Sequence, residues 1–208
     1  MEIKRLVLGM VRTNCYIAYT EESKKAVVID PAADSGRIME ELAVLGVTPE
    51  AVLLTHGHFD HMLAADTLRK QYRIPVCILK EDAELLEQPE LNGSELFMRM
   101  SYGITADELL LDGQQLRFLD GTLRVIASPG HTAGSCCYYQ EAERVLFSGD
   151  TLFQGSVGRT DLPTGKASLI SVSIREKLFV LPEDTLVLSG HGMETTIGEE
   201  KEHNPYVV

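Results

Sequence analysis

The amino-acid sequence predicts an α/β layered fold in which two β-sheets pack together and helices cover their outer faces. Three observations support this prediction. Short apolar, β-branched runs recur along the chain, helical patterns come between groups of them, and Gly, Pro, Asp or Asn bounds most of them. With 208 residues, 44% of them hydrophobic, the chain can close a substantial core, and we expect residues 1–208 to form one domain.

The strands are expected where the apolar runs are short and rich in β-branched or aromatic residues. They are residues 3–9, 15–20, 25–30, 51–55, 76–79, 115–119, 122–128, 136–140, 144–149 and 185–190. The first part of the chain holds one group of strands and the second part repeats the pattern. This repetition suggests two sheets rather than one.

Helices are expected over residues 34–45, 61–72 and 166–181, where apolar residues recur at helical spacing. Gly46 provides a stop signal after the first of these segments. Residues 81–103 predict a loop with a short helix. This stretch is interpreted as a solvated helical insertion, with a wall beside a site as the alternative.

The composition restricts the partners. A net charge of −12 with scattered Lys and Arg argues against nucleic acid and anionic membranes, which require a basic surface. The first residues show neither a cleavage site nor a membrane span, so we expect a cytoplasmic protein that acts on a small molecule. The four cysteines lack a CxxC spacing, and neighbouring Cys136 and Cys137 would point to opposite faces of a strand, so buried, reduced thiols are expected.

Three of the six histidines lie in the stretch THGHFDHM, residues 55–62. In an extended segment His56 and His58 point the same way and can reach one metal ion, while Asp60 and His61 can turn toward a second position. The alternative is a turn with an Asp cap and solvated histidines. Four ligand-type residues within six positions favour the metal.

Further ligand-type residues follow later strands, each next to a glycine: His131 in SPGHT, Asp150 in FSGDT and His191 in LSGHG. Glycine lets the backbone approach closely, and strand ends are where layered α/β folds gather their sites. His203, near the C-terminus, is left over and is expected to lie on the surface.

Seven ligands are too many for one tetrahedral zinc ion but suit two metal ions. His56, His58 and His131 are assigned to the first metal, Asp60, His61 and His191 to the second, and Asp150 to both. Imidazole and carboxylate ligands without thiolate suit zinc, iron or manganese, and zinc is the metal we expect.

The ordered motifs THGHFDH, SPGHT, SGDTLF and SGHG resemble those of the metallo-β-lactamase-fold hydrolases over essentially the whole chain. Within that group the chain looks most like the glyoxalase II enzymes, hydroxyacylglutathione hydrolases that cleave thioesters, in a short single-domain form. The resemblance implies an αββα sandwich with two mixed sheets flanked by helices and a dinuclear metal site at one sheet edge.

Two departures matter for the substrate. True β-lactamases of this fold carry a cysteine where Asp150 stands, which disfavours antibiotic hydrolysis. Two-domain glyoxalase II enzymes continue into a helical domain that supplies basic residues for glutathione, whereas this sequence ends with TTIGEEKEHNPYVV. The expected substrate is therefore an anionic thioester such as S-lactoylglutathione, held loosely, or a different thioester or ester.

Two further residues have alternative roles. Arg159, in GSVGRTDLPTG, stands where a basic residue faces the substrate in glyoxalase II, or it pairs with Asp161 to brace its loop. Asp30 resembles a position that braces a ligand, or it ends its strand in a plain turn. The GRTD string also resembles persulfide dioxygenases of this fold, which use a single iron, although SGHGMETTIG matches the hydrolases better.

The leading hypothesis is a hydrolase in which two metals lower the pKa of a bridging water from about 15.7 toward 7, and the hydroxide attacks the thioester carbonyl. Asp60 and Asp150 are its catalytic residues. The alternatives are a mononuclear iron persulfide dioxygenase and a non-catalytic metal-binding module, and the second of these requires a broken ligand set. No GxSxG motif indicates a serine nucleophile.

Overall fold

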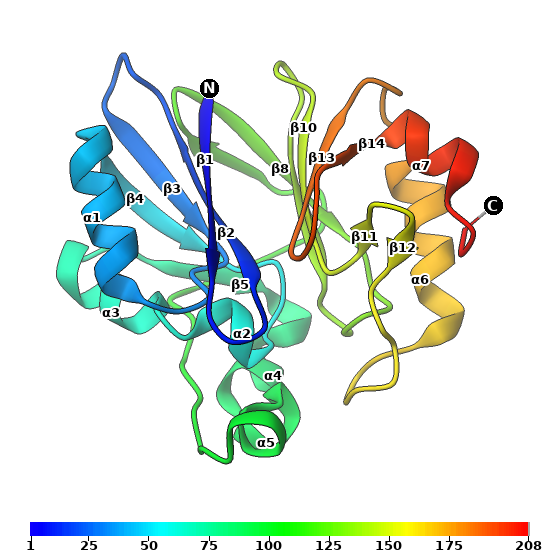
Figure 1. Ribbon diagram of the computed structural model, residues 1–208, viewed down its shortest axis with the longest axis horizontal. Coiled ribbons are helices and arrows are strands. Elements are labelled where there is room, and N and C mark those ends of the chain that lie inside the picture. The colour runs from blue at the N-terminus through cyan, green and yellow to red at the C-terminus, as the bar shows by residue number, and fades with distance from the viewer. Residues whose placement is uncertain (208) are drawn as a thin grey trace.

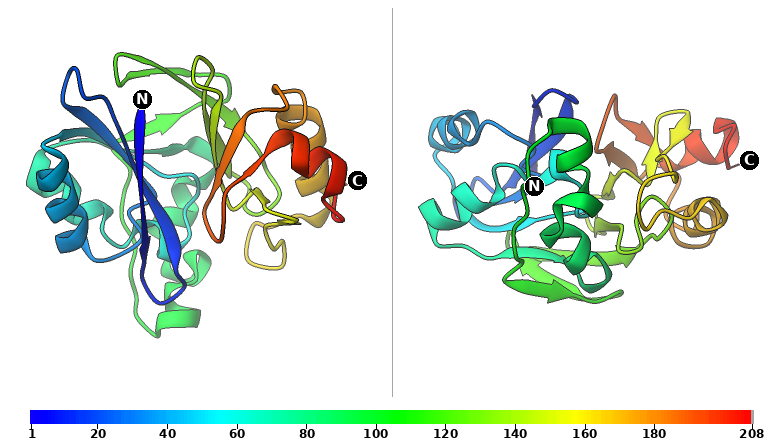
Figure 2. Two further views of the ribbon diagram at one scale, coloured as in Figure 1. Left: turned by 45° about the horizontal axis from the view of Figure 1, so that its top comes forward. Right: turned by 90° about the horizontal axis from the view of Figure 1, so that it is seen from below.

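The computed structural model describes residues 1–207, in which two six-stranded sheets face each other and helices cover both outer sides (Figure 1). In Figure 2, the helices α1 (Ser35–Leu45) and α3 (Ala65–Tyr72) lie at one end of the molecule, and both sheets lie between them and the helices at the other end, α6 (Ala167–Ser173) and α7 (Ile197–His203). The predicted two-sheet architecture with flanking helices is confirmed. None of the helices within residues 1–207 is long and apolar enough to span a membrane.

The first sheet has the strand order β1-β2-β3-β4-β5-β6. Its first three strands are antiparallel to one another, and β3 to β6 are parallel. The strands are β1 (Glu2–Leu8), β2 (Thr13–Tyr19), β3 (Lys25–Ile29), β4 (Thr48–Leu53), β5 (Val76–Leu79) and β6 (Glu108–Leu110). Sequence reasoning missed β6, a three-residue edge strand in which two residues are exposed.

The second sheet has the strand order β14-β13-β10-β9-β8-β7, and only its β10–β13 pair is parallel. A small hairpin, β11 with β12, lies outside both large sheets. The strands are β7 (Gln115–Phe118), β8 (Gly121–Ala127), β9 (Cys136–Gln140), β10 (Val145–Gly149), β11 (Leu152–Phe153), β12 (Ser156–Val157), β13 (Leu186–Ser189) and β14 (Thr195–Thr196).

The helices include one at each of the three predicted positions, although not always with the predicted length, and one, over residues 197–203, that sequence reasoning missed. They are α1 (Ser35–Leu45), α2 (Phe59–Met62), α3 (Ala65–Tyr72), α4 (Ala83–Glu87), α5 (Pro89–Asn92), α6 (Ala167–Ser173) and α7 (Ile197–His203), with a 3₁₀ turn η1 (Lys80–Asp82) and the π-turns η2 (Ser94–Met98) and η3 (Ile174–Leu178). The helix predicted over 61–72 is two helices, because the Ala64 N–H donates to the Pro31 carbonyl at 2.9 Å instead of continuing the helical ladder. The one predicted over 166–181 is α6 followed by η3.

The core follows the alternation of side chains along the strands. On β3, Val27 and Ile29 pack between the two sheets, whereas Val28 packs against the helices outside the first sheet. Cys136 and Cys137 divide in the same way, one between the sheets and one against the outer helices of the second sheet. The prediction of four buried, free thiols is confirmed.

The strand directions decide where a site can form. Strands β8, β10 and β13 run in the same direction, so their carboxyl ends meet at one edge of the second sheet. The carboxyl end of β4 reaches the same place from the first sheet: the Thr55 carbonyl, just beyond β4, accepts a hydrogen bond from Cys136 N at 2.8 Å. The predicted motifs all follow these four ends.

Candidate metal centre

Three histidines from two of these strand ends form the first cluster. His56 and His58 follow β4, His131 follows β8, and one ring nitrogen of each lies within 4.8 Å of those of the others. His58 Nδ1 is 2.9 Å from His131 Nε2, and that atom is 3.2 Å from His56 Nε2. These are the three residues predicted for a first metal.

The hydrogen bonds around the rings show that lone pairs face each other in this cluster. His131 Nδ1 faces the Arg159 carbonyl at 2.7 Å and must donate to it, which leaves Nε2 unprotonated in the neutral ring. The Thr55 hydroxyl donates to Asp30, so it accepts from His56 Nδ1, and His56 Nε2 is also a lone pair. Two lone pairs 3.2 Å apart cannot bond to each other, and this arrangement fits a cation between them.

Asp60, His61 and His191 form the second cluster, again within 4.8 Å of one another. His61 Nε2 lies 3.6 Å from Asp60 Oδ2, and His191 Nε2 lies 3.4 Å from the same oxygen. His61 Nε2 is buried without a hydrogen-bond partner. A buried nitrogen facing carboxylates in this way suits a metal ligand.

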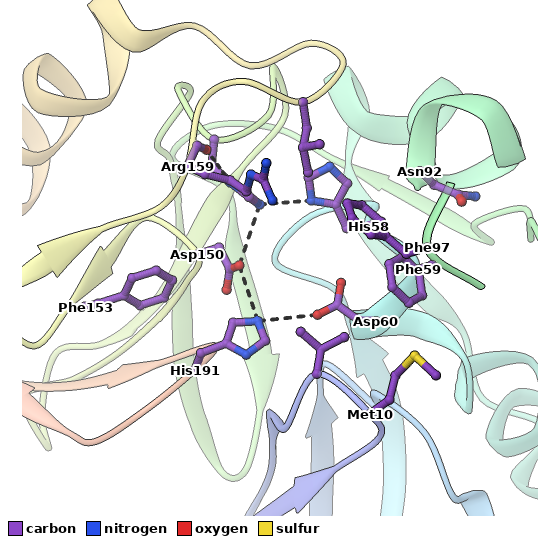
Figure 3. A pocket seen from close by; sticks show the side chains of 13 residues that line it. Met10, His58, Phe59, Asp60, Asn92, Phe97, Asp150, Phe153, Arg159 and His191 are labelled. Atoms are coloured by element: carbon purple, nitrogen blue, oxygen red, sulfur yellow. Dashed lines mark hydrogen bonds and ion pairs between the residues drawn. The ribbon is translucent and has the colours of Figure 1, made fainter. Parts of the chain in front are cut away.

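Asp150 lies between the two clusters (Figure 3). Its Oδ2 is 3.7 Å from His131 Nε2 in the first cluster and 3.5 Å from His191 Nε2 in the second. Its Oδ1 is buried without a hydrogen-bond partner and lies 3.4 Å from His61 Nε2. The structure thus brings all seven predicted ligand residues together, with Asp150 where a shared ligand would lie.

The electrostatics of the two clusters differ. Burial and the neighbouring His131 lower the pKa of His58 to about 3, and burial with the surrounding imidazoles lowers the pKa of His56 well below its usual range. Both rings are therefore neutral at pH 7 and offer lone pairs. Neutral imidazole is the form that binds metal ions.

The second cluster is charged. Burial lowers the pKa of His61, but the carboxylates of Asp60, Asp150 and Asp30 outweigh it and raise the value to about 9. Burial also lowers the pKa of His191, but the carboxylates of Asp150 and Asp60 outweigh it and raise the value to about 10. Without a metal, these rings carry protons at pH 7 that a bound cation would have to displace.

Asp30 holds one of these rings in place. Its Oδ2 accepts from His61 Nδ1 at 2.9 Å and from the Thr55 hydroxyl at 2.7 Å, and its Oδ1 accepts from the Thr55 N–H at 2.8 Å. The residue is 2% exposed and has a φ of 50°, in the left-handed region. Of the two roles considered for Asp30, bracing a ligand agrees with these contacts.

Asp82 was missed by sequence reasoning. This buried carboxylate, in η1, accepts from Gly57 N at 3.0 Å, from the Thr132 hydroxyl at 2.7 Å and from Gly134 N at 2.6 Å. It ties the loop of His56 and His58 to the loop of His131. Burial raises the pKa of this carboxyl group and outweighs the three hydrogen bonds, which lower it. The signal available in the sequence was its position three residues after a predicted strand.

A close approach of backbone explains one of the glycines beside the ligands. A Cβ on Gly190 would lie 2.2 Å from Asp150 Oδ1 and 2.8 Å from His61 Cε1, so any side chain there would enter the second cluster. The Gly190 carbonyl also accepts from Asn14 N at 2.7 Å, which joins β2 of the first sheet to the His191 loop. The prediction that glycine permits close approach holds at this position.

Arg159 forms the ion pair that was one of its two expected roles. Its Nε and Nη2 bond to the two carboxylate oxygens of Asp161 at 2.7 and 2.8 Å. Arg159 also lines the pocket above the clusters, together with Asn92 and Phe97 of the 81–103 segment (Figure 3). That segment was expected to be a solvated insertion, yet part of it forms a wall of the site. His203 is exposed, as expected.

Among curated proteins, the chain is 36% identical over 208 residues to the probable metallo-hydrolase YqgX of Bacillus subtilis, covering 100% of this chain and 98% of that protein. It is 32% identical over 209 residues to the hydroxyacylglutathione hydrolase GloC of Haemophilus influenzae, with coverage of 100% and 98%. Each relative therefore matches the chain along nearly its full length.

Solved structures give the same result. The crystal structure of the BLEG-1 B3 metallo-β-lactamase has a TM-score of 0.95 and 43% identity, covering 99% of both chains. TTHA1623 in a di-iron-bound form has a TM-score of 0.86 and 33% identity, covering 98% of this chain and 99% of that one. The profile of the metallo-beta-lactamase superfamily matches residues 8–191. With two sheets flanked by helices and a His/Asp cluster that could hold metal ions at their shared edge, the chain belongs to the metallo-β-lactamase superfamily.

Proposed function

We propose that the protein is a dinuclear metal-dependent hydrolase that cleaves a thioester such as S-lactoylglutathione. The observation that carries the proposal is the position of Asp150 Oδ2, 3.7 and 3.5 Å from ring nitrogens of the two clusters. A carboxylate shared by two sets of ligands is the arrangement expected of a two-metal hydrolase. The similarity to GloC, named a hydroxyacylglutathione hydrolase, supports the thioester.

His56, His58 and His131 would hold one metal ion and Asp60, His61 and His191 the other, with Asp150 shared. Bound divalent ions, of which zinc is the one we expect and iron or manganese the alternatives, would supply an acidified water and a polarised carbonyl. In the overall reaction a C–O bond to the water oxygen forms, the C–S bond breaks, and the products are a carboxylic acid and a thiol.

The chain's own residues prepare this chemistry. Asp30 fixes the ring of His61 through Nδ1, so that Nε2 faces Asp60 and Asp150, and the Arg159 carbonyl fixes the ring of His131 in the same way. Such outer contacts set the tautomer and orientation of metal-binding histidines. Thr13 donates to Asp60 Oδ2 at 2.9 Å and holds that carboxylate toward the second cluster.

The test combines metal analysis with activity. The protein as purified should contain about two metal ions per chain, and the zinc-loaded protein should hydrolyse S-lactoylglutathione or related thioesters, with thiol release followed by a thiol-reactive dye. A single iron per chain, with oxygen uptake on addition of glutathione persulfide, would instead establish a persulfide dioxygenase. A protein that binds metal but turns over neither substrate would be a binding module.

β-Lactam hydrolysis is a second candidate because of the 43% identity to a protein named a B3 metallo-β-lactamase. Because of that similarity, the presence of Asp150 is not a sufficient reason to exclude β-lactam antibiotics as substrates. The same zinc-loaded protein can be assayed with a chromogenic cephalosporin. A kcat/KM for the cephalosporin above that for every thioester tested would favour this second function.

A further inference from the structure

The pocket above the two clusters has mostly apolar walls. Its volume is about 540 Å³, within the range of small-molecule sites. The apolar residues that line it come from five separate segments of the chain: Met10, Val11, Phe59, Phe97, Phe153 and Leu162. Figure 3 shows Phe153 on one side of the polar centre and the pair Phe59 and Phe97 on the other.

The pair of phenylalanines forms the more extended of these walls. The rings of Phe59 and Phe97 stack with centroids 5.9 Å apart and planes at 25°. Phe59 is only 4% exposed and supports Phe97, which is 45% exposed and leaves its ring available to a ligand. Phe59 directly follows His58, so this wall stands beside the first cluster.

The pocket offers little to recognise a charged thiol. Among its lining residues within 1–207, Arg159 is the one Lys or Arg, and Asp161 already pairs with it through two hydrogen bonds. The Asn92 side chain is also occupied, since it donates to the Tyr102 carbonyl at 2.8 Å and accepts from Ser94 N at 2.9 Å. A substrate with several carboxylates, such as a glutathione thioester, finds no free cationic side chain on these walls.

We infer that the pocket selects thioesters with a hydrophobic acyl group that packs on Phe97, and that it recognises the thiol part weakly. The inference rests on the proposed thioester hydrolysis and narrows its substrate class. The phenylalanine wall stands beside His58 of the first cluster, so the acyl substituent of a thioester whose carbonyl binds at that cluster lies against the wall. Burial of apolar surface there favours longer aliphatic or aromatic acyl groups.

The test measures kcat/KM of zinc-loaded protein for acetyl, butyryl and hexanoyl thioesters of N-acetylcysteamine, and for lactoyl thioesters of N-acetylcysteamine and glutathione. Each fully buried methylene is worth about a fourfold rate increase. Because the Phe97 ring is half-exposed, we expect an overall gain of at least about tenfold from acetyl to hexanoyl. Replacing N-acetylcysteamine with glutathione should change the lactoyl rate less than about threefold, a difference below about 0.7 kcal/mol.

Variants locate the effect. Phe97→Ala should reduce the hexanoyl-to-acetyl ratio severalfold, whereas the neighbouring Leu96→Ala, a 69% exposed residue that does not line the pocket, should keep the wild-type ratio. The ratio is insensitive to a partly unfolded sample, which lowers both rates equally. Thioester hydrolysis without acyl selectivity, or a large preference for glutathione, would overturn the inference alone. Absence of hydrolysis for every thioester would overturn the proposed function as well.

Discussion

Replacement of Asp82 by asparagine tests whether a residue that touches no predicted ligand side chain controls the first metal site. The carboxylate accepts three hydrogen bonds, from Gly57 N, the Thr132 hydroxyl and Gly134 N. An asparagine oxygen can keep the two bonds of Oδ2, but its NH₂ group then faces the Gly134 N–H, and a buried donor is left unpaired. That loss is worth about 1–3 kcal/mol, and for a chain of this size each kcal/mol lowers the Tm by about 2–4 °C.

The decisive measurement is metal affinity rather than stability. Because Asp82 ties the His56–His58 loop to the His131 loop, we expect Asp82→Asn to weaken the first site by about 10-fold to 100-fold, the usual effect of losing a residue that positions ligands. Cobalt titration of metal-free protein against a competing chelator reports the affinities, and the cobalt absorption spectrum reports the ligand geometry.

A matched control is Asp107→Asn. The Asp107 carboxylate accepts from Val76 N at 2.9 Å, at the opposite end of β5 from Asp82, and should affect stability without altering either metal site. If Asp82→Asn lowers the Tm but binds both cobalt ions with wild-type affinity and spectrum, Asp82 is a structural residue only and the positioning argument is wrong.

Two further predictions concern the shared carboxylate and the charged cluster. Asp150→Ala should reduce the metal content from about two ions per chain to about one and abolish nearly all thioester hydrolysis; two bound metals with full activity would disprove the bridging role. In metal-free protein, the raised pKa values of His61, about 9, and His191, about 10, predict stability that is greatest below pH 6.5 and is lost as the pH rises through 9 to 10. Thermal denaturation in chelator from pH 6 to 10 measures this loss, which metal-loaded protein should not show, and a flat Tm profile would contradict the ion pairs.

The local patterns of the chain were sufficient for much of the fold. Ten apolar runs were predicted to be strands, and each overlaps a strand of the two large sheets, because strands that are buried on both faces form apolar runs. Errors occurred where tertiary contacts override local preference. The break between α2 and α3 depends on a hydrogen bond from Ala64 to Pro31, some thirty residues earlier, which no helical periodicity can reveal.

By itself, the sequence determined the chemistry available to the site, since residue types and their places after strands identified seven ligand-type side chains. Only the tertiary structure decided how they combine: the common direction of β8, β10 and β13 brings His131, Asp150 and His191 to one edge. The tertiary structure also decided which other residues lie beside these ligand-type side chains. Asp82 and the Phe97 wall come from the 81–103 segment, whose position depends on packing between distant parts of the chain and not on any local pattern.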